Sequence, residues 1–178
     1  SYFMNEEGVA YQPTEIVVPL GITKIDDYKF YGFTNLTSVT LSEDVVEIGD
    51  YAFYNCSSLS NIIWPNKMDR IGKYAFYNCD KITKLELPSV TLIDDYAFYW
   101  SNGISEITFK EGLITIGDYA FEGAKNITKL HLPEGFESIG DYVFNDSYEI
   151  TELILPSTIK YIGDNSFSIN NNWTKIYN

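Results

Sequence analysis

The stretch Ile48-Gly49-Asp50-Tyr51-Ala52-Phe53 decides the fold, because the chain repeats it in close variants along most of its length. It returns unchanged as Ile116-Gly117-Asp118-Tyr119-Ala120-Phe121. The closing phenylalanine recurs every 23 residues, with one interval of 22, at Phe30, Phe53, Phe76, Phe98, Phe121, Phe144 and Phe167. A fixed period in this range is typical of a solenoid, in which each repeat buries its apolar face on its neighbours.

The composition agrees with a folded array and excludes some partners. Of the 178 residues, 45% are hydrophobic and 16% aromatic, which is enough for an apolar core. The 12 basic and 25 acidic residues leave a formal charge of −13, which would repel phosphate backbones, so we expect no nucleic-acid partner. No apolar run approaches the roughly 18 residues of a spanning helix, so we expect no membrane insertion.

The repeats divide the chain into two parts. Residues 1–15 fit the pattern poorly and are interpreted as a degenerate N-terminal partial repeat or cap. Residues 16–178 are predicted to form an array of seven repeats, the last one truncated. Because the chain starts without Met and stops inside a repeat, we interpret it as a fragment of a longer protein, so the lack of a secretory signal says nothing about that protein.

Each repeat contains a short segment that alternates apolar and mostly polar residues, as in Leu85-Glu86-Leu87 and Leu130-His131-Leu132. Such alternation predicts a strand with its two apolar residues inward, and stacking one strand per repeat predicts a parallel sheet. Proline follows the strand in most repeats, where its missing N–H ends the ladder.

A second inward column consists of isoleucine only, at Ile25, Ile48, Ile71, Ile93, Ile116, Ile139 and Ile162. The next residue is Gly or Asp, which predicts a positive φ, and an aspartate then precedes Tyr-Ala-Phe as the N-cap of a short helical turn. We therefore predict a right-handed, gently curved solenoid with a parallel β-sheet on its concave face and short helical turns and loops on its convex face.

The segment from Leu59 to Pro65, followed by Ile71-Gly72-Lys73-Tyr74-Ala75-Phe76-Tyr77-Asn78-Cys79, resembles the BspA-like class of leucine-rich repeats. The resemblance covers about residues 16–178. It implies a secreted or cell-surface protein of a host-associated microbe that adheres to host proteins or other cells. It implies no catalytic residue, so we expect a non-catalytic module.

Tyrosines form the most distinctive surface feature, which we call the tyrosine flank. They stand in two columns three residues apart, so we expect them to share one face of the convex side. Their members are Tyr28, Tyr51, Tyr74 and Tyr96, continued by Tyr119 and Tyr142, and beside them Tyr31, Tyr54, Tyr77 and Tyr99. Exposed aromatic surface usually marks an interaction site. The alternative is that the rings only pack on each other.

The concave face is a second candidate for ligand binding. Its outward residues include Ile63, Lys84, Glu86, Glu106, Thr108, Lys129, His131, Glu152 and Ile154. The alternating charges at Lys84, Glu106, Lys129 and Glu152 can instead be read as ion pairs between neighbouring strands that fix the register.

Other chemistry is not indicated. The aspartate column suggests calcium, but its residues recur once per repeat and do not cluster as calcium ligands do, so we expect no metal or cofactor. His131 is the single histidine, which excludes common zinc and nucleophilic arrangements. Cys56 and Cys79 fall in one inward column; the pattern favours two buried thiols and leaves a disulfide open.

We therefore predict an extracellular recognition or adhesion module that binds a host or cell-surface protein or a glycan. The alternative function is a structural spacer within a larger surface protein. Since an open strand edge tends to pair with another chain, the edge at Trp173–Tyr177 is expected to support self-association.

Overall fold

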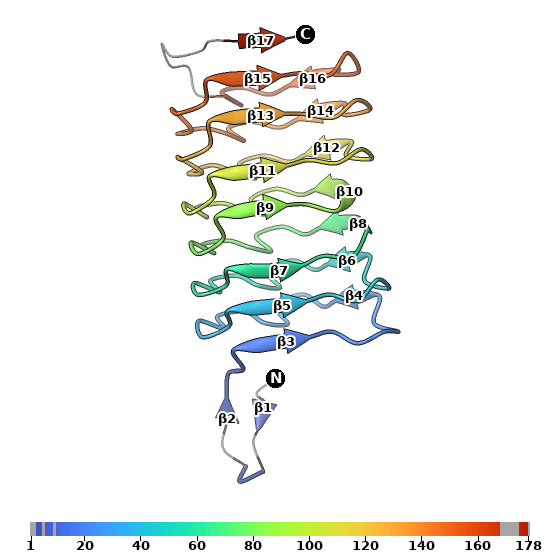
Figure 1. Cartoon of the computed structure of the whole chain (residues 1–178), viewed down its shortest axis with the longest axis vertical. Coiled ribbons are helices and arrows are strands. Elements are labelled where there is room, and N and C mark those ends of the chain that lie inside the picture. The colour runs from blue at the N-terminus through green and yellow to red at the C-terminus, as the bar shows by residue number, and fades with distance from the viewer. Residues whose placement is uncertain (1–2, 5, 9, 168–174, 178) are drawn as a thin grey trace.

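The structure is a computed structural model that describes residues 3–4, 6–8, 10–167 and 175–177. The chain winds into a stack of coils with about six turns (Figure 1). The first strand of each coil lies on one wall, which we call the strand face. Its strands are β3 (Glu15–Val17), β5 (Ser38–Thr40), β7 (Asn61–Ile63), β9 (Lys84–Glu86), β11 (Glu106–Thr108), β13 (Lys129–His131), β15 (Glu152–Ile154) and β17 (Lys175–Tyr177).

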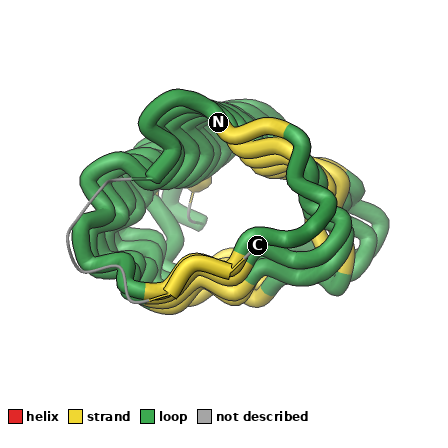
Figure 2. Tube along the Cα trace, turned by 90° about the horizontal axis from the view of Figure 1, so that it is seen from above, coloured by secondary structure: helices red, strands yellow, loops and turns green. Residues whose placement is uncertain are grey.

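A second wall carries a continuous sheet of seven parallel strands that the sequence pattern did not predict. Its strands are β4 (Lys24–Ile25), β6 (Glu47–Ile48), β8 (Lys67–Ile71), β10 (Ser89–Ile93), β12 (Thr115–Ile116), β14 (Ser138–Ile139) and β16 (Tyr161–Ile162). The isoleucine column forms the last residue of each strand, and Ile48 pairs with Ile71 across the ladder. Seen along the stack, strands occupy two walls of the coil and turns close the rest (Figure 2).

Two further strands, β1 (Phe3–Met4) and β2 (Ala10–Tyr11), pair antiparallel beyond the first coil (Figure 1). All other pairs between the described strands are parallel, as predicted. The described residues contain no helix that could cross a membrane.

The core is built by translation of one coil onto the next. Consecutive rings of the phenylalanine column, from Phe30 to Phe167, stack with centroids 5.1 to 5.9 Å apart. Cys56 and Cys79 are buried free thiols, and each Sγ donates to a backbone carbonyl of an earlier coil. Burial raises the pKa of the Cys56 thiol to about 12. The predicted alignment of inward columns is therefore confirmed, and the open question of the disulfide is answered.

The prediction of short helical turns on the convex side was wrong, since the described residues form no helix. The tyrosine before Ala-Phe adopts a positive φ, for example 58° at Tyr51 and 54° at Tyr74, which a right-handed helix cannot accommodate. The backbone N–H groups instead bond to the next coil: Tyr51 N donates to Lys73 O and Phe53 N to Ala75 O, each at 2.8 Å. These segments are successive tight turns joined by a ladder between coils.

The glycine after the inward isoleucine does not take a positive φ, contrary to our prediction. It is required by close approach. A Cβ built on Gly117 would lie 2.4 Å from Oδ1 of Asp95 and 2.6 Å from its backbone N. The same aspartate oxygen accepts a hydrogen bond from Asp118 N at 3.0 Å. The aspartate therefore joins two coils instead of capping a helix.

The strand face, unlike the second wall, is interrupted. Its strands form three separate ladders, β3-β5-β7, β9-β11 and β13-β15-β17. We call the two interruptions the β7–β9 seam and the β11–β13 seam. The predicted single sheet on this face is thus divided, while the opposite sheet holds the coils together.

Candidate functional site

The tyrosine flank forms two stacks of rings along the solenoid. In the longer column, from Tyr28 to Tyr142, consecutive centroids are 4.6 to 5.0 Å apart and the ring planes differ by at most 12°. In the shorter column, Tyr31, Tyr54 and Tyr77 stack at 4.8 and 4.4 Å. The structure therefore brings all ten tyrosines of the flank together. Stacking covers the faces of the tyrosine rings, and the inner rings of both columns are half-buried.

Stacking holds the longer column in an unfavourable backbone conformation. A bulky residue with φ near +58° costs about 1–2 kcal/mol relative to the right-handed region. The stacked rings remove apolar surface from water, which offsets this cost. The same partial burial raises the pKa of the phenols of Tyr51, Tyr74 and Tyr96 above the ordinary value.

The shorter column ends at the predicted Tyr99, beside an exposed tryptophan that the sequence analysis missed. The ring of Tyr99 meets Tyr77 at 5.6 Å with a 26° tilt and stands edge-on to Tyr96 at 5.3 Å. Trp100 lies next to it, with centroids 5.9 Å apart, and is 51% exposed. The column ends here because the next coil carries Glu122 at the position of the tyrosine.

Trp100 has a φ of 58°. Its equivalents in the other described coils are the residue types that tolerate this conformation, namely Gly32, Asn55, Asn78, Gly123 and Asp146. A tryptophan at a position that is otherwise Gly, Asn or Asp is the sequence signal that could have revealed a special role of Trp100.

A carboxylate lies beside this cluster. Oε1 of Glu122 accepts a hydrogen bond from Asn145 Nδ2 at 3.1 Å, whereas Oε2 is buried and accepts none from the described residues. Burial and then the nearby charge of Glu122 raise the pKa of the Tyr99 phenol. An aromatic edge, an exposed indole and an acceptor oxygen thus occupy one part of the flank, which we call the Trp100 cluster (Tyr99, Trp100 and Glu122).

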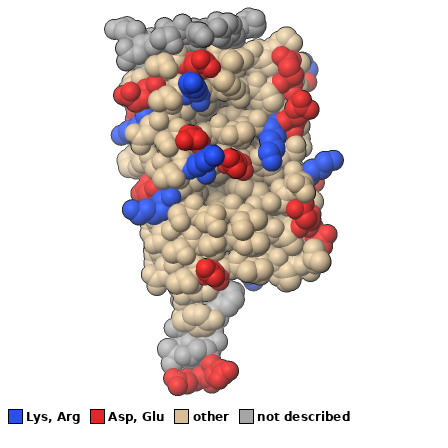
Figure 3. Space-filling model, viewed as in Figure 1, with Lys and Arg blue, Asp and Glu red and all other residues tan. Residues whose placement is uncertain are grey.

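The predicted strand-face residues lie on one wall in the expected register. Lys84 pairs with Glu106 and Lys129 with Glu152 across the ladders. Nearly all of the nine are exposed, while Glu152 and Ile154 are half-buried. In Figure 3, charged side chains gather on the upper part of this face, and the lower part is largely uncharged.

The ion pairs on this face differ from the predicted ladder. The ammonium of Lys84 binds Glu86 of its own strand at 3.0 Å and makes no ion pair with Glu106. His131 Nε2 lies 2.6 Å from Glu152 Oε1, which joins neighbouring strands. Hydrogen bonding and the charge of Glu86 raise the pKa of Lys84.

The second wall holds an ionic centre that the sequence analysis also missed. Arg70 is the single arginine, and its guanidinium donates to Glu47 at 3.1 Å and to Asp94 at 2.8 Å, and also contacts Asp50. These partners belong to the coils on either side, so Arg70 joins three coils. The described residues contain no group of three or more His, Cys, Asp or Glu side chains arranged to hold a metal.

Comparison with known proteins agrees with this architecture. The BspA type leucine rich repeat region matches residues 10–99 and 91–178, with six copies. A leucine rich cell surface protein from Faecalibacterium prausnitzii is 28% identical with a TM-score of 0.81, covering 98% of this chain and 52% of its own. Our chain thus spans about half of that protein. Comparison with curated proteins gave no match.

A second solved structure supports the fold. The leucine rich repeat protein TpLRR of T. pallidum has a TM-score of 0.80 at 23% identity, covering 92% of this chain and 82% of its own. Repeat period, core columns and the family match agree over nearly the whole chain, and the match indicates a repeat scaffold with no catalytic family. The chain belongs to the BspA-type leucine-rich repeat family.

Proposed function

We propose that this chain is an extracellular recognition module that binds a protein or glycan partner through the Trp100 cluster of the tyrosine flank. The family match and the similarity to a cell surface protein support a surface role. Within this surface, the position of Trp100 carries the proposal. Its side chain is half-exposed and its backbone is strained, so neither burial nor backbone preference explains a tryptophan there.

The cluster has the features of a recognition site. Tryptophan and tyrosine are the residues that contribute most to binding at interfaces. The stacked tyrosines hold the platform rigid, which lowers the entropy cost of binding. Because the carboxylate of Glu122 is buried or bonded to Asn145, contact with a glycan or protein partner falls on the exposed indole of Trp100.

The test replaces Trp100 with the residue of the equivalent positions, Trp100→Asn. Since asparagine tolerates the conformation, we expect the free energy of unfolding to stay unchanged or rise by up to about 1 kcal/mol. Binding to members of a glycan array and a panel of extracellular matrix proteins should weaken about tenfold or more. Tyr161→Ser, which removes an exposed aromatic residue from the second wall, is the matched control and should bind as the wild type does.

Two results would contradict the proposal. If Trp100→Asn keeps the affinity of the wild type for every ligand of the panel, the cluster is not the site. If the wild type binds none of the ligands, the structural-spacer function is favoured.

A further inference from the structure

The strand face opens where β7 and β9 are neighbours. No Cα atom of β7 lies within 8 Å of a Cα atom of β9, although bonded strands lie about 4.8 Å apart. On the second wall the same two coils stay joined, because β8 and β10 pair over five-residue strands. The β7–β9 seam is thus the wider of the two interruptions in the strand face (Figure 1).

The seam leaves backbone groups of both strands without the partners they have elsewhere. In closed parts of the face, Leu41 N donates to Ile63 O at 2.9 Å and Leu87 N to Thr108 O at 3.2 Å. The equivalent bond from Trp64 N to Glu86 O is absent from the described hydrogen bonds. At the other end of the strands, Ser60 N and its hydroxyl both donate to Thr37 O.

The corresponding bonds from Thr83 to Ser60 O are likewise missing between these two coils. The hydrogen bonds between β7 and β9 are therefore missing at both ends of the strands. Each of the two strands presents a row of unpaired N–H and C=O groups to the gap. Such a row is a template for pairing with another strand.

Bulky aromatic residues explain why the ladder opens. Trp64 occupies a position that is leucine in most repeats, and its indole packs edge-on against Phe76 at 5.6 Å. Phe109 holds the same position at the β11–β13 seam and packs against Phe121 at 5.9 Å. Each seam therefore follows a coil with an aromatic ring at this position. The larger ring, that of Trp64, precedes the wider β7–β9 seam, where no Cα atoms of the two strands lie within 8 Å of each other.

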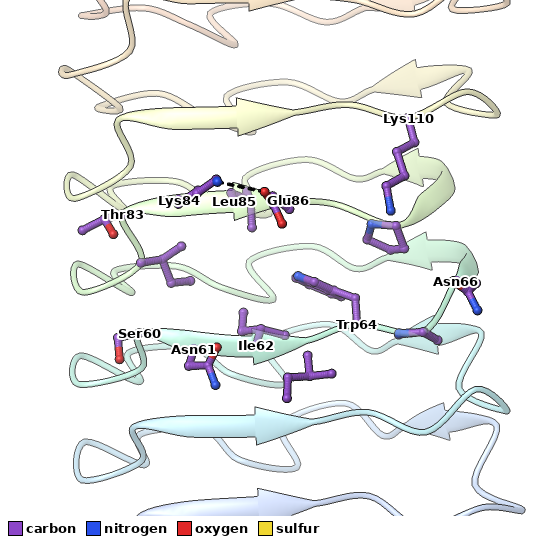
Figure 4. A pocket seen from close by; sticks show the side chains of 14 residues that line it. Ser60, Asn61, Ile62, Trp64, Asn66, Thr83, Lys84, Leu85, Glu86 and Lys110 are labelled. Carbon is purple, nitrogen blue, oxygen red and sulfur yellow. Dashed lines mark ion pairs between the residues drawn. The ribbon is translucent and has the colours of Figure 1, made fainter.

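A cavity of about 500 Å³ fills the β7–β9 seam (Figure 4). The half-buried side chains of Ile62 and Trp64 contribute apolar surface to it. Lys84 and Glu86 lie along β9 and neutralise each other through their ion pair, and Lys110 extends toward one end of the cavity (Figure 4).

The geometry points to the β7–β9 seam as a binding site for an extended peptide segment of a partner protein, which enters as an additional strand. Its backbone would bond to β7 along one edge and to β9 along the other, as in strand addition to a sheet edge. Since each flanking strand has three residues, the inserted segment needs only about three to four residues in extended conformation.

A peptide fits this site better than other ligands do. Only a polypeptide offers alternating N–H and C=O groups at the spacing of the two strand edges. The outward side chains of β7, Asn61 and Ile63, are uncharged, and the charges on β9 are paired, so a segment with little charge is favoured. The ammonium of Lys110 makes no ion pair with the described residues and favours one acidic group at that end of the segment.

This site is separate from the Trp100 cluster and uses main-chain recognition in place of aromatic contact. Failure of either proposal would therefore leave the other standing. The Trp100→Asn variant should bind peptide at the seam as well as the wild type does.

The experiment measures amide hydrogen exchange by NMR with a peptide that copies residues 36–42, which include the uncharged strand β5. In the free protein, we expect the Trp64 amide to exchange much faster than those of Leu41 and Leu87, because these two are bonded to the next coil. The peptide at about 1 mM should slow exchange at Trp64 about tenfold.

Three comparisons decide the outcome. The same peptide, N-methylated at the residues that correspond to Val39 and Thr40, keeps its side chains but loses a donor on each edge, and it should give no protection. Trp64→Leu should close the seam, protect the amide at position 64 without peptide and abolish peptide binding. Phe109→Leu, the matched change at the other seam, should leave binding intact.

The proposal is overturned if the Trp64 amide is already protected in the free protein or if the peptide gives no protection at about 1 mM. Equal protection by the N-methylated peptide would also overturn it, and this result needs no variant of the protein. Unchanged peptide binding by Trp64→Leu would do the same.

Discussion

At the glycine that follows the inward isoleucine, each coil comes into contact with the one before it. The aspartate of the earlier coil occupies the space where a side chain would lie, as Asp95 does beneath Gly117. Among the coils after the first, one carries an aspartate, Asp94, at the position of this glycine. The coil before it carries Lys73 at the position where the other coils have the contacting aspartate. Glycine and aspartate are therefore coupled between neighbouring coils.

Gly117→Ala tests this contact. The new Cβ would lie 2.4 Å from Asp95 Oδ1 and 2.6 Å from Asp95 N, so the two coils must separate. We expect the free energy of unfolding, measured by urea denaturation, to fall by about 1–3 kcal/mol. Lys125→Ala, at an exposed position of the next turn, should change it by less than about 0.5 kcal/mol. A loss at Gly117 no larger than at Lys125 would show that the coils are not in close contact.

Among the structural elements, the tyrosine columns replace the helical turns of the predicted fold. Each turn is held by bonds to the next coil and by ring stacking, so no turn is stable without its neighbours. Partial burial raises the pKa of the phenols of Tyr51, Tyr74 and Tyr96. The columns therefore make the fold sensitive to alkaline pH.

The sign of this effect follows from the direction of the shifts. A phenol whose pKa is higher in the folded than in the unfolded state favours folding below the unfolded pKa of about 10, and this contribution is lost as pH rises beyond it. We expect the melting temperature to fall as pH rises from about 9 to 11. The phenolate absorbance of the folded protein should develop at higher pH than that of the protein in urea. Coincident titration curves in the two states would contradict this account.

For the molecule as a whole, the coils are joined by one continuous sheet and one divided face. At the β7–β9 seam the two coils are joined by β8 and β10 and by the ion pairs of Arg70 with Asp94 and of Lys73 with Asp95, while Glu47 and Asp50 tie Arg70 to the preceding coil. The array should therefore be least cooperative at this point, because a solenoid depends on contacts between neighbours.

Arg70→Gln tests the junction. Losing hydrogen bonds to three carboxylates at a half-buried site should lower the free energy of unfolding by about 1–3 kcal/mol. We expect urea denaturation, followed by circular dichroism, to change from one transition to two. Lys160→Gln removes the exposed pair with Glu137 on the same wall and should leave one transition. A single transition in Arg70→Gln would mean that the backbone ladder of β8 and β10 is sufficient.

The open end of the array remains a prediction. β17 is the last strand of its ladder, while Trp173 and Thr174 of the expected self-association edge lie outside the described residues. Sedimentation across a range of concentrations would test whether the chain associates through this end.

The sequence by itself determined the stacking of coils, the inward columns and the two aromatic stripes, because a period of 23 residues places equivalent side chains over one another. It also identified the tyrosines that the structure brings together. Only the tertiary structure decided that tyrosine and not glycine takes the positive φ, that tight turns bonded between coils replace the helical turns, that a second sheet forms, and that one wall is open between β7 and β9. These features depend on how one coil fits against the next, which is set by side-chain volume and backbone distance between repeats and not by the pattern within one repeat.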